Sequence, residues 1–162
     1  YRYGQASATL ERMLQVLPKA MRDRVPTLRV AYGIEELREK LVADLTSINE
    51  QFRKAADAKQ QNHNRLWELD EKFHRRYVES GAGVRLLTLH DAVKPQAERY
   101  ERIYVSLLSR DLSPSVAEHV AIIKAIKTGN ADAAQLCVQS NWRNAADRLG
   151  SVITNVGERG QW

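Results

Sequence analysis

The apolar residues of this chain recur with the period of an α-helix along most of its length. Between residues 34 and 58, for example, Leu37, Leu41 and Leu45 fall on one helical stripe. The same pattern predicts further helices over residues 6–22, 62–80, 84–110, 113–129 and 130–156. Only eight glycines and four prolines occur, and no stretch alternates convincingly as a strand does. We therefore expect an all-α fold, an antiparallel bundle of about six to seven helices with mostly short loops.

Residues with strong local preferences mark the expected helix boundaries. Asn62 or Asn64 is expected to cap the helix that ends near residue 80. Ser113 precedes Pro114, a pair typical of an N-cap followed by the first helical residue. Residues 24–33 contain a proline and end on a glycine, so we expect a connector there.

Length and composition exclude several classes of protein. A chain of 162 residues has the length of one domain. Its net charge of +5 comes from basic residues dispersed among acids, which favours solvated helix faces over a nucleic-acid-binding patch. The longest apolar runs are far too short to span a bilayer, so we expect no membrane partner. The single cysteine, Cys137, cannot form an internal disulfide, which fits a reducing cytoplasm.

Four polar residues fall on helix faces that are otherwise apolar. Asp70 and His74 stand one helical turn apart, so their side chains point to the same side. His119 and Asn141 occupy apolar stripes of two other expected helices. A buried polar group without a partner costs about 1–3 kcal/mol, so we expect these groups to meet around a metal ion or small ligand. Each also has a simpler interpretation, as a satisfied core histidine or a hydrogen-bonded Asp–His pair.

Two segments resemble the FCD class of ligand-binding domains of GntR-type transcription regulators. Residues 69–75, with the sequence LDEKFHR, resemble the D-x-x-F-H signature of that class. Residues 118–134 resemble its block E-H-x-x-I-x-x-A-I-x-x-G-D-x-x-A-A. The two blocks, with the helices around them, cover about residues 34–156. The resemblance implies a helical bundle with a central cavity that binds a small effector, often a carboxylate.

The resemblance also implies a candidate metal site. Many members hold a divalent ion, commonly zinc or nickel, with an Asp, a His, a second His and a third His. The first three positions correspond here to Asp70, His74 and His119, whereas the fourth is Asn141. An amide oxygen is a weak zinc ligand, so a water or the effector would have to complete the site. Members of the family that bind their effector without a metal leave the alternative of a metal-free cavity open.

Three arginines are candidates for binding the carboxylate of an effector, because a guanidinium can clamp a carboxylate through two hydrogen bonds. Arg99 and Arg102 lie on the expected helix 84–110, which should border the cavity. Arg12 is the candidate on the first helix, where the family also uses an arginine. The alternative is that all three are surface residues.

Together these features predict that residues 1–162 form one effector-binding and dimerisation domain of a transcription regulator, and not an enzyme. We expect a homodimer that uses the first and fourth helices, as the resemblance implies. DNA would be bound only through the family's winged helix-turn-helix domain, which we expect to be absent from this chain. A metal-dependent hydrolase remains a rival, although Glu71 points away from the stripe and no other obvious general base is present. A purely structural helical module is the other rival.

Overall fold

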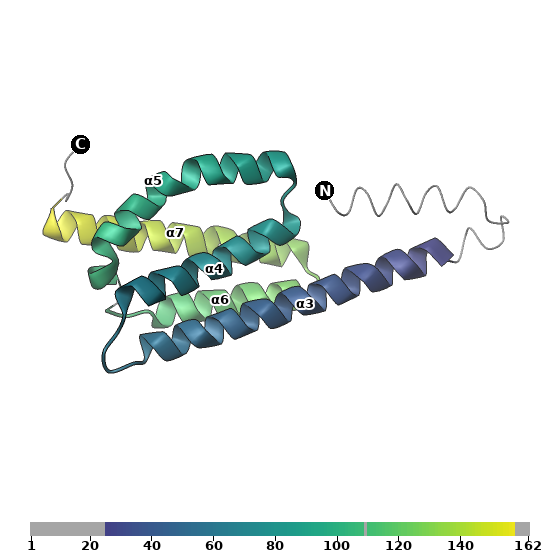
Figure 1. Ribbon diagram of the computed structural model, residues 1–162, viewed down its shortest axis with the longest axis horizontal. Helices are drawn as coiled ribbons and strands as arrows, with labels where there is room; N and C mark the ends of the chain where they lie inside the picture. The colour runs from purple at the N-terminus through teal and green to yellow at the C-terminus, as the bar shows by residue number, and fades with distance from the viewer. Residues whose placement is uncertain (1–24, 109, 158–162) are drawn as a thin grey trace. The chain divides into compact units, whose positions relative to one another are not determined.

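The computed structural model describes residues 25–108 and 110–157, and within these ranges every regular element is an α-helix. Figure 1 shows the five described helices. They are α3 (Val25–Ala56), α4 (His63–Gly81), α5 (Val84–Leu108), α6 (Ser113–Lys127) and α7 (Ala131–Val156). The all-α prediction is therefore confirmed. The helix expected over residues 6–22 lies outside the described residues.

The chain divides into two compact units between Lys40 and Leu41. In the first unit, the described residues form the N-terminal part of α3. The expected connector at residues 24–33 is wrong, because α3 begins at Val25 and continues through this segment. Pro26 stands in the first helical turn, where its missing N–H would have no helical partner. Gly33 lies inside the helix, where a glycine costs only about 1 kcal/mol relative to alanine.

Asparagine side chains begin two helices of the second unit. The Asn62 side chain accepts a hydrogen bond of 3.0 Å from the backbone N–H of Arg65, which confirms it as the cap of α4. In the same way, the Asn130 side chain accepts a hydrogen bond of 2.9 Å from the backbone N–H of Ala133 at the start of α7. Both caps satisfy a backbone donor that has no partner within the helix.

The start of α6 differs from the sequence-based expectation. Leu112 is the N-cap residue, and Ser113 is already the first helical residue. The Asp111 carboxylate accepts hydrogen bonds from the Ser113 backbone N–H at 3.0 Å and from its hydroxyl at 2.6 Å. An ionised carboxylate is a stronger acceptor than a hydroxyl, so Asp111 takes over the role expected of Ser113.

Short connections make consecutive helices of the second unit run antiparallel. The connection between α4 and α5 comprises residues 82–83, and that between α6 and α7 comprises residues 128–130. Gly129 has a φ of 67°, which reverses the chain after α6 at no steric cost. Helix α4 packs on α5, α6 packs on α7, and α5 packs on α7. Helices α5 and α7 run in the same direction, and α4 runs in the opposite direction to both (Figure 1).

Two apolar clusters join the C-terminal part of α3 to α4 and α6. One contains Leu45, Ile48, Phe73 and Ile122, and the other contains Phe52, Leu66 and Leu69. Among the described residues, four buried polar side chains lie within this core, namely Asn49, His74, His119 and Asn141. Three of these four are residues that the sequence marked as polar groups on apolar faces. None of the described helices combines the length and the apolar composition needed to cross a membrane.

Candidate functional site

Asp70, His74 and His119 converge in the core of the second unit. Helix α4 presents Asp70 and His74 from one face, and α6 presents His119 toward them. One potential ligand atom from each residue lies within 4.8 Å of the others. The Nε2 atom of His74 is 3.6 Å from Oδ2 of Asp70, and the Nε2 atom of His119 is 3.4 Å from Oδ1 of the same carboxylate. The three residues therefore form a compact set of one carboxylate and two imidazoles.

Asn49 on α3 fixes the orientation of the His119 ring. The Asn49 amide nitrogen donates to the carbonyl oxygen of Val116 at 3.3 Å, which leaves the amide oxygen facing His119. The Nδ1 atom of His119 is 3.0 Å from that oxygen and must therefore carry the hydrogen. Phe73 stacks on the imidazole, with ring centroids 3.9 Å apart. These contacts turn the unprotonated Nε2 toward Asp70, as a metal ligand requires.

The Nε2 atom of His119 is the feature that best tests whether a metal fits. It is buried and has no hydrogen-bond partner among the described residues. A buried acceptor without a partner costs about 1–3 kcal/mol, which a bound cation would recover. Two ligands of one zinc-like ion, each about 2.1 Å from it, are separated by about 3–3.5 Å. The separations of the two Asp70 oxygens from the imidazoles are close to this, and all three donors lie within 4.8 Å of one another, so small side-chain adjustments would let the donor set hold a divalent ion.

Burial places both histidines in the protonation state that binds metals. Burial, together with the positive charge of nearby Lys94, lowers the pKa of His74 to about 4. Burial is also the main cause that lowers the pKa of His119 to about 2. Both imidazoles are therefore neutral at neutral pH. Burial raises the pKa of Asp70 to about 7 against the opposing effect of Arg148 and Lys94, so its proton is easily displaced by a cation.

His74 is held by aromatic neighbours on its other side. Its Nδ1 atom is 2.9 Å from the Tyr77 hydroxyl oxygen, one helical turn along α4. The rings of His74 and Trp142 lie with centroids 5.2 Å apart, so α7 also packs against this imidazole. The Tyr77 hydroxyl therefore helps to position a candidate ligand.

Asn141 is buried beside the triad and takes part in a polar network with Glu118. Its amide nitrogen donates to Glu118 at 2.8 Å, and Asn144 and Arg148 donate to the same carboxylate. Burial opposes ionisation of Glu118, but the hydrogen bonds from Arg148, Asn144 and Asn141 lower its pKa overall. Because the nitrogen is used by Glu118, the amide oxygen is the atom of Asn141 that is left for a ligand.

A cavity of about 220 Å³ adjoins the triad. Asp70, His74 and Asn141 contribute to its wall, and 38% of the Asp70 side chain is accessible. Most of the remaining wall is apolar, with contributions from Phe52, Leu66, Trp67, Val105, Leu108 and Leu149. A concave, largely apolar cavity with a few convergent polar groups is the usual form of a small-molecule site.

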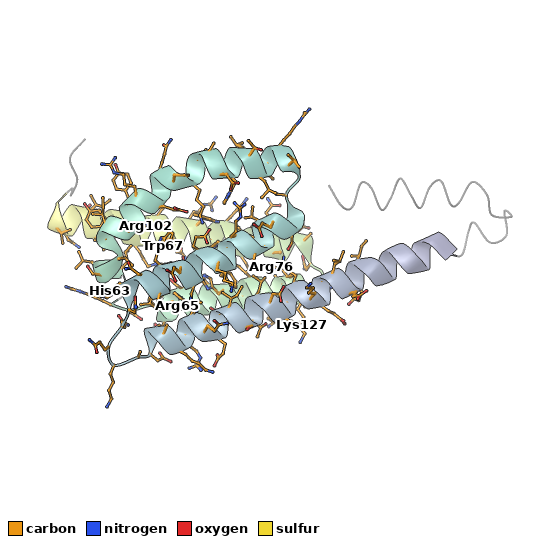
Figure 2. The ribbon with its side chains drawn as sticks, in the orientation of Figure 1. His63, Arg65, Trp67, Arg76, Arg102 and Lys127 are labelled. Atoms are coloured by element: carbon orange, nitrogen blue, oxygen red, sulfur yellow. The ribbon has the colours of Figure 1, made fainter. Side chains whose placement is uncertain are left out.

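The arginine that lines the cavity was missed by the sequence analysis. Arg148 on α7 lines the cavity, whereas Arg99 and Arg102 are exposed and do not belong to its wall. The guanidinium of Arg102 instead lies over the Trp67 ring, 3.8 Å from its centroid. Figure 2 labels both residues. Arg12 lies outside the described residues. The spacing held a signal for Arg148, because a residue seven positions after Asn141 lies on the same helix face.

Asn49 was also missed, although it stands next to Ile48 on the apolar stripe of α3. A search for every polar residue on such a stripe would have found it, but not its partner. Glu101 is another cavity residue that the sequence did not mark. Burial, together with the charge of Asp70, raises its pKa, and it accepts a hydrogen bond of 3.4 Å from the indole of Trp67.

Comparison with known protein families gives one match, in which the FCD domain model covers residues 20–144. No curated protein and no solved structure was found to match the chain. The matched range includes both sequence blocks and all three residues of the triad. The chain therefore belongs to the FCD domain family, the C-terminal effector-binding domains of GntR-type transcription regulators.

Proposed function

We propose that residues 1–162 form one ligand-sensing and dimerisation domain, which binds a small organic acid at a divalent metal site. The observation that carries the proposal is the triad of Asp70, His74 and His119, two of which, Asp70 and His74, line the cavity. The FCD family supplies the regulatory setting. In that setting the occupied cavity controls DNA binding by a winged helix-turn-helix domain, and the protein works in the cytoplasm.

Zinc or nickel is the proposed ion, held by the carboxylate of Asp70 and by Nε2 of His74 and His119. A bound ion of this kind acts as a Lewis acid and can coordinate a carboxylate oxygen of the effector. The three protein ligands leave at least one position open, which a water, the effector or the amide oxygen of Asn141 would fill. The unpartnered Nε2 of His119 is the observation that supports the metal most directly.

The charges around the cavity support an acid as the effector only when the metal is bound. Asp70 and Glu101 both line the wall, and the positive charge of Arg148 is balanced by Glu118. A divalent ion adds two positive charges beside Asp70 and makes this end of the cavity attractive to an anion. Effector binding is therefore expected to require the metal.

Control of DNA binding follows from the helices that surround the cavity. Its wall contains residues of α3, α4, α5, α6 and α7, so a ligand that fits one arrangement of these helices better favours that arrangement. The same ligand then shifts the relative placement of the two DNA-binding domains of a dimer.

A metal and ligand assay tests the proposal. The purified protein is expected to contain or to bind about one equivalent of zinc or nickel, measured by elemental analysis. It should then show a rise in melting temperature with small organic acids. His119→Ala should lose both effects, whereas His63→Ala, at the first residue of α4, should keep them. Equal metal content in the parent and in His119→Ala would contradict the proposed site.

We also propose that two copies of the chain associate through α5. Leu86, Leu89 and Val93 lie on one stripe of this helix, and each is more than half exposed. The same helix is the fourth of the expected six, for which the family resemblance implies a role in dimerisation. Leu89→Glu is expected to shift the protein toward monomer in sedimentation velocity, whereas Leu136→Glu on α7 should not. A monomeric parent protein would contradict this interface.

Hydrolysis is a second candidate function, because one cavity residue has the properties of a general base. Glu101 lines the cavity, and burial raises its pKa. A catalytic metal with an open position would be required as well. Ester or phosphoester turnover by the metal-loaded protein, lost in both His119→Ala and Glu101→Gln, would support this candidate and overturn the regulatory proposal. We expect no turnover.

A further inference from the structure

The wall of the cavity changes from polar to apolar along three helices. On α7 it passes from Asn141 to Ala145 and Leu149, at intervals of one helical turn. On α5 it passes from Glu101 to Val105 and Leu108. On α4, which runs in the opposite direction, it passes from His74 and Asp70 back to Leu66. The triad therefore lies at one end of a cavity whose other end is apolar.

The apolar end offers no unbalanced positive charge for a second acidic group. Arg148, next to Leu149 on α7, is the cationic residue of the described wall, but its guanidinium already donates to Glu118 at 2.9 and 3.1 Å. Lys94 is held by Glu71 and Glu98 and does not line the cavity. Glu101 would repel a second carboxylate. An acidic group away from the triad would therefore lose its hydration without gaining a partner.

Hydroxyl groups on the body of the effector are disfavoured for the same reason. The wall beyond the triad is formed mainly by side chains that neither donate nor accept hydrogen bonds, such as Phe52, Leu108 and Leu112. Its polar side chains are already engaged, because the Ser115 hydroxyl accepts a hydrogen bond of 3.3 Å from Arg148 and the Trp67 indole donates to Glu101. A hydroxyl buried against them without a partner costs about 1–3 kcal/mol. A sugar acid carries several hydroxyl groups, so this cost would be paid several times and its binding would be weak.

The volume of the cavity sets the size of the body. An enclosed apolar cavity of about 150 Å³ is large enough to hold benzene. The present cavity of about 220 Å³ therefore accommodates one six-membered ring together with a carboxylate. The rings of Trp67 and Trp142 contribute flat apolar surface to the wall.

From these observations we infer that the effector is a monocarboxylic acid with a compact apolar body, the size of one ring or a short alkyl chain. The carboxylate faces the triad and the body fills the apolar end. This inference rests on the proposed function, because it assumes that the cavity is the effector site. It goes further in excluding dicarboxylates and sugar acids as effectors.

Matched ligands test the inference on the unaltered, zinc-loaded protein by isothermal titration calorimetry. Benzoate and cyclohexanecarboxylate are expected to bind at least tenfold more tightly than acetate, which lacks the body. Terephthalate adds a second carboxylate to benzoate, and a tetrahydroxylated cyclohexanecarboxylate adds hydroxyls to the other ring. Both are expected to bind at least tenfold more weakly than their parent acids. Benzamide, which has the ring without the charge, should bind weakly.

A variant that fills the cavity provides a second test. Ala145→Leu adds volume to the wall one turn from Asn141, so benzoate should bind at least tenfold more weakly while zinc and acetate bind as before. Ala121→Leu, at an exposed position on α6, is the matched control and should change none of these affinities. Unchanged benzoate affinity in Ala145→Leu would overturn the inference. If that variant does not fold, the ligand series on the unaltered protein still tests the inference.

The outcomes separate this inference from the proposed function. If terephthalate or the hydroxylated acid binds as tightly as its parent acid, the inference is wrong and the metal-dependent acid sensor stands. If no acid binds the zinc-loaded protein, acetate included, both are wrong.

Discussion

The amide oxygen of Asn49 and the Nδ1 atom of His119 are 3.0 Å apart, although the two residues are separated by 70 positions in the chain. This hydrogen bond selects the tautomer of His119 in which Nε2 is unprotonated and faces Asp70. Asn49 is itself fixed by its hydrogen bond to the carbonyl oxygen of Val116 on α6, the helix that carries His119. A residue of α3 therefore orients His119, a candidate metal ligand that belongs to α6.

Removing this hydrogen bond should weaken metal binding without removing a ligand. Asn49→Leu is expected to lower zinc affinity by about 10–100-fold, the usual effect of losing the partner that orients a ligating histidine. Competition with a chromophoric chelator measures the change. Asn64→Leu, at an exposed position near the start of α4, is the matched control and should bind zinc as the parent does. Equal affinity in both variants would show that Asn49 does not orient the ligand.

Zinc affinity should depend on pH through Asp70. Its pKa of about 7 means that the carboxyl is protonated below pH 7, so a metal ion must displace that proton. Affinity is therefore expected to fall about tenfold for each pH unit below 7 and to level off above it. The histidines, with pKa values of about 4 and about 2, add no dependence between pH 5 and 8. Titrations from pH 5.5 to 8.5 measure this slope, and a flat profile across that range would contradict the expectation.

Replacing Asn141 by histidine should strengthen the site. The new imidazole replaces a weak amide donor by a good zinc ligand, so Asn141→His is expected to bind zinc at least tenfold more tightly. Asn144→His is the control, because it also removes a hydrogen bond to Glu118 but stands at an exposed position. Unchanged affinity in Asn141→His would show that residue 141 does not face the metal.

Neutralising Glu118 should loosen the contact between α6 and α7. Its carboxylate accepts hydrogen bonds from Asn141, Asn144 and Arg148, so Glu118→Gln is expected to reduce the free energy of unfolding by about 1–3 kcal/mol. Urea denaturation measures the loss, with the exposed Glu68→Gln as control. Glu118→Gln should also bind benzoate more tightly than the parent protein does in the absence of metal, because the charge of Arg148 is then unbalanced. An unchanged midpoint of unfolding would argue against the network.

Local features of the molecule could be inferred from the sequence. The helical period of the apolar residues predicted α4, α5, α6 and α7 within a few residues of their bounds. Asn62 was one of the two caps predicted for α4, together with Asn64, because capping depends on a side chain and the backbone three residues away. The pairing of Asp70 with His74 followed from their spacing, because residues four apart on a helix always share a face.

Other features depended on how the helices pack. Periodicity shows that His119 faces a core, but not which residues it meets, and Asp70 lies 49 positions earlier in the chain. The arginines illustrate the same limit. Arg99, Arg102 and Arg148 are all long charged side chains on helices, and only the rotation of α7 against α4 and α5 places Arg148 at the cavity.

The sequence by itself determined the all-α class, the polar residues on apolar faces and the identity of the candidate metal ligands. The tertiary structure decided which nitrogen of His119 faces Asp70, which arginine lines the cavity and how far the apolar wall extends from the triad. The physical reason is the distance along the chain over which each interaction acts. Helix formation and capping depend on neighbours within about four residues, whereas a site of three converging side chains depends on the relative rotation and translation of packed helices.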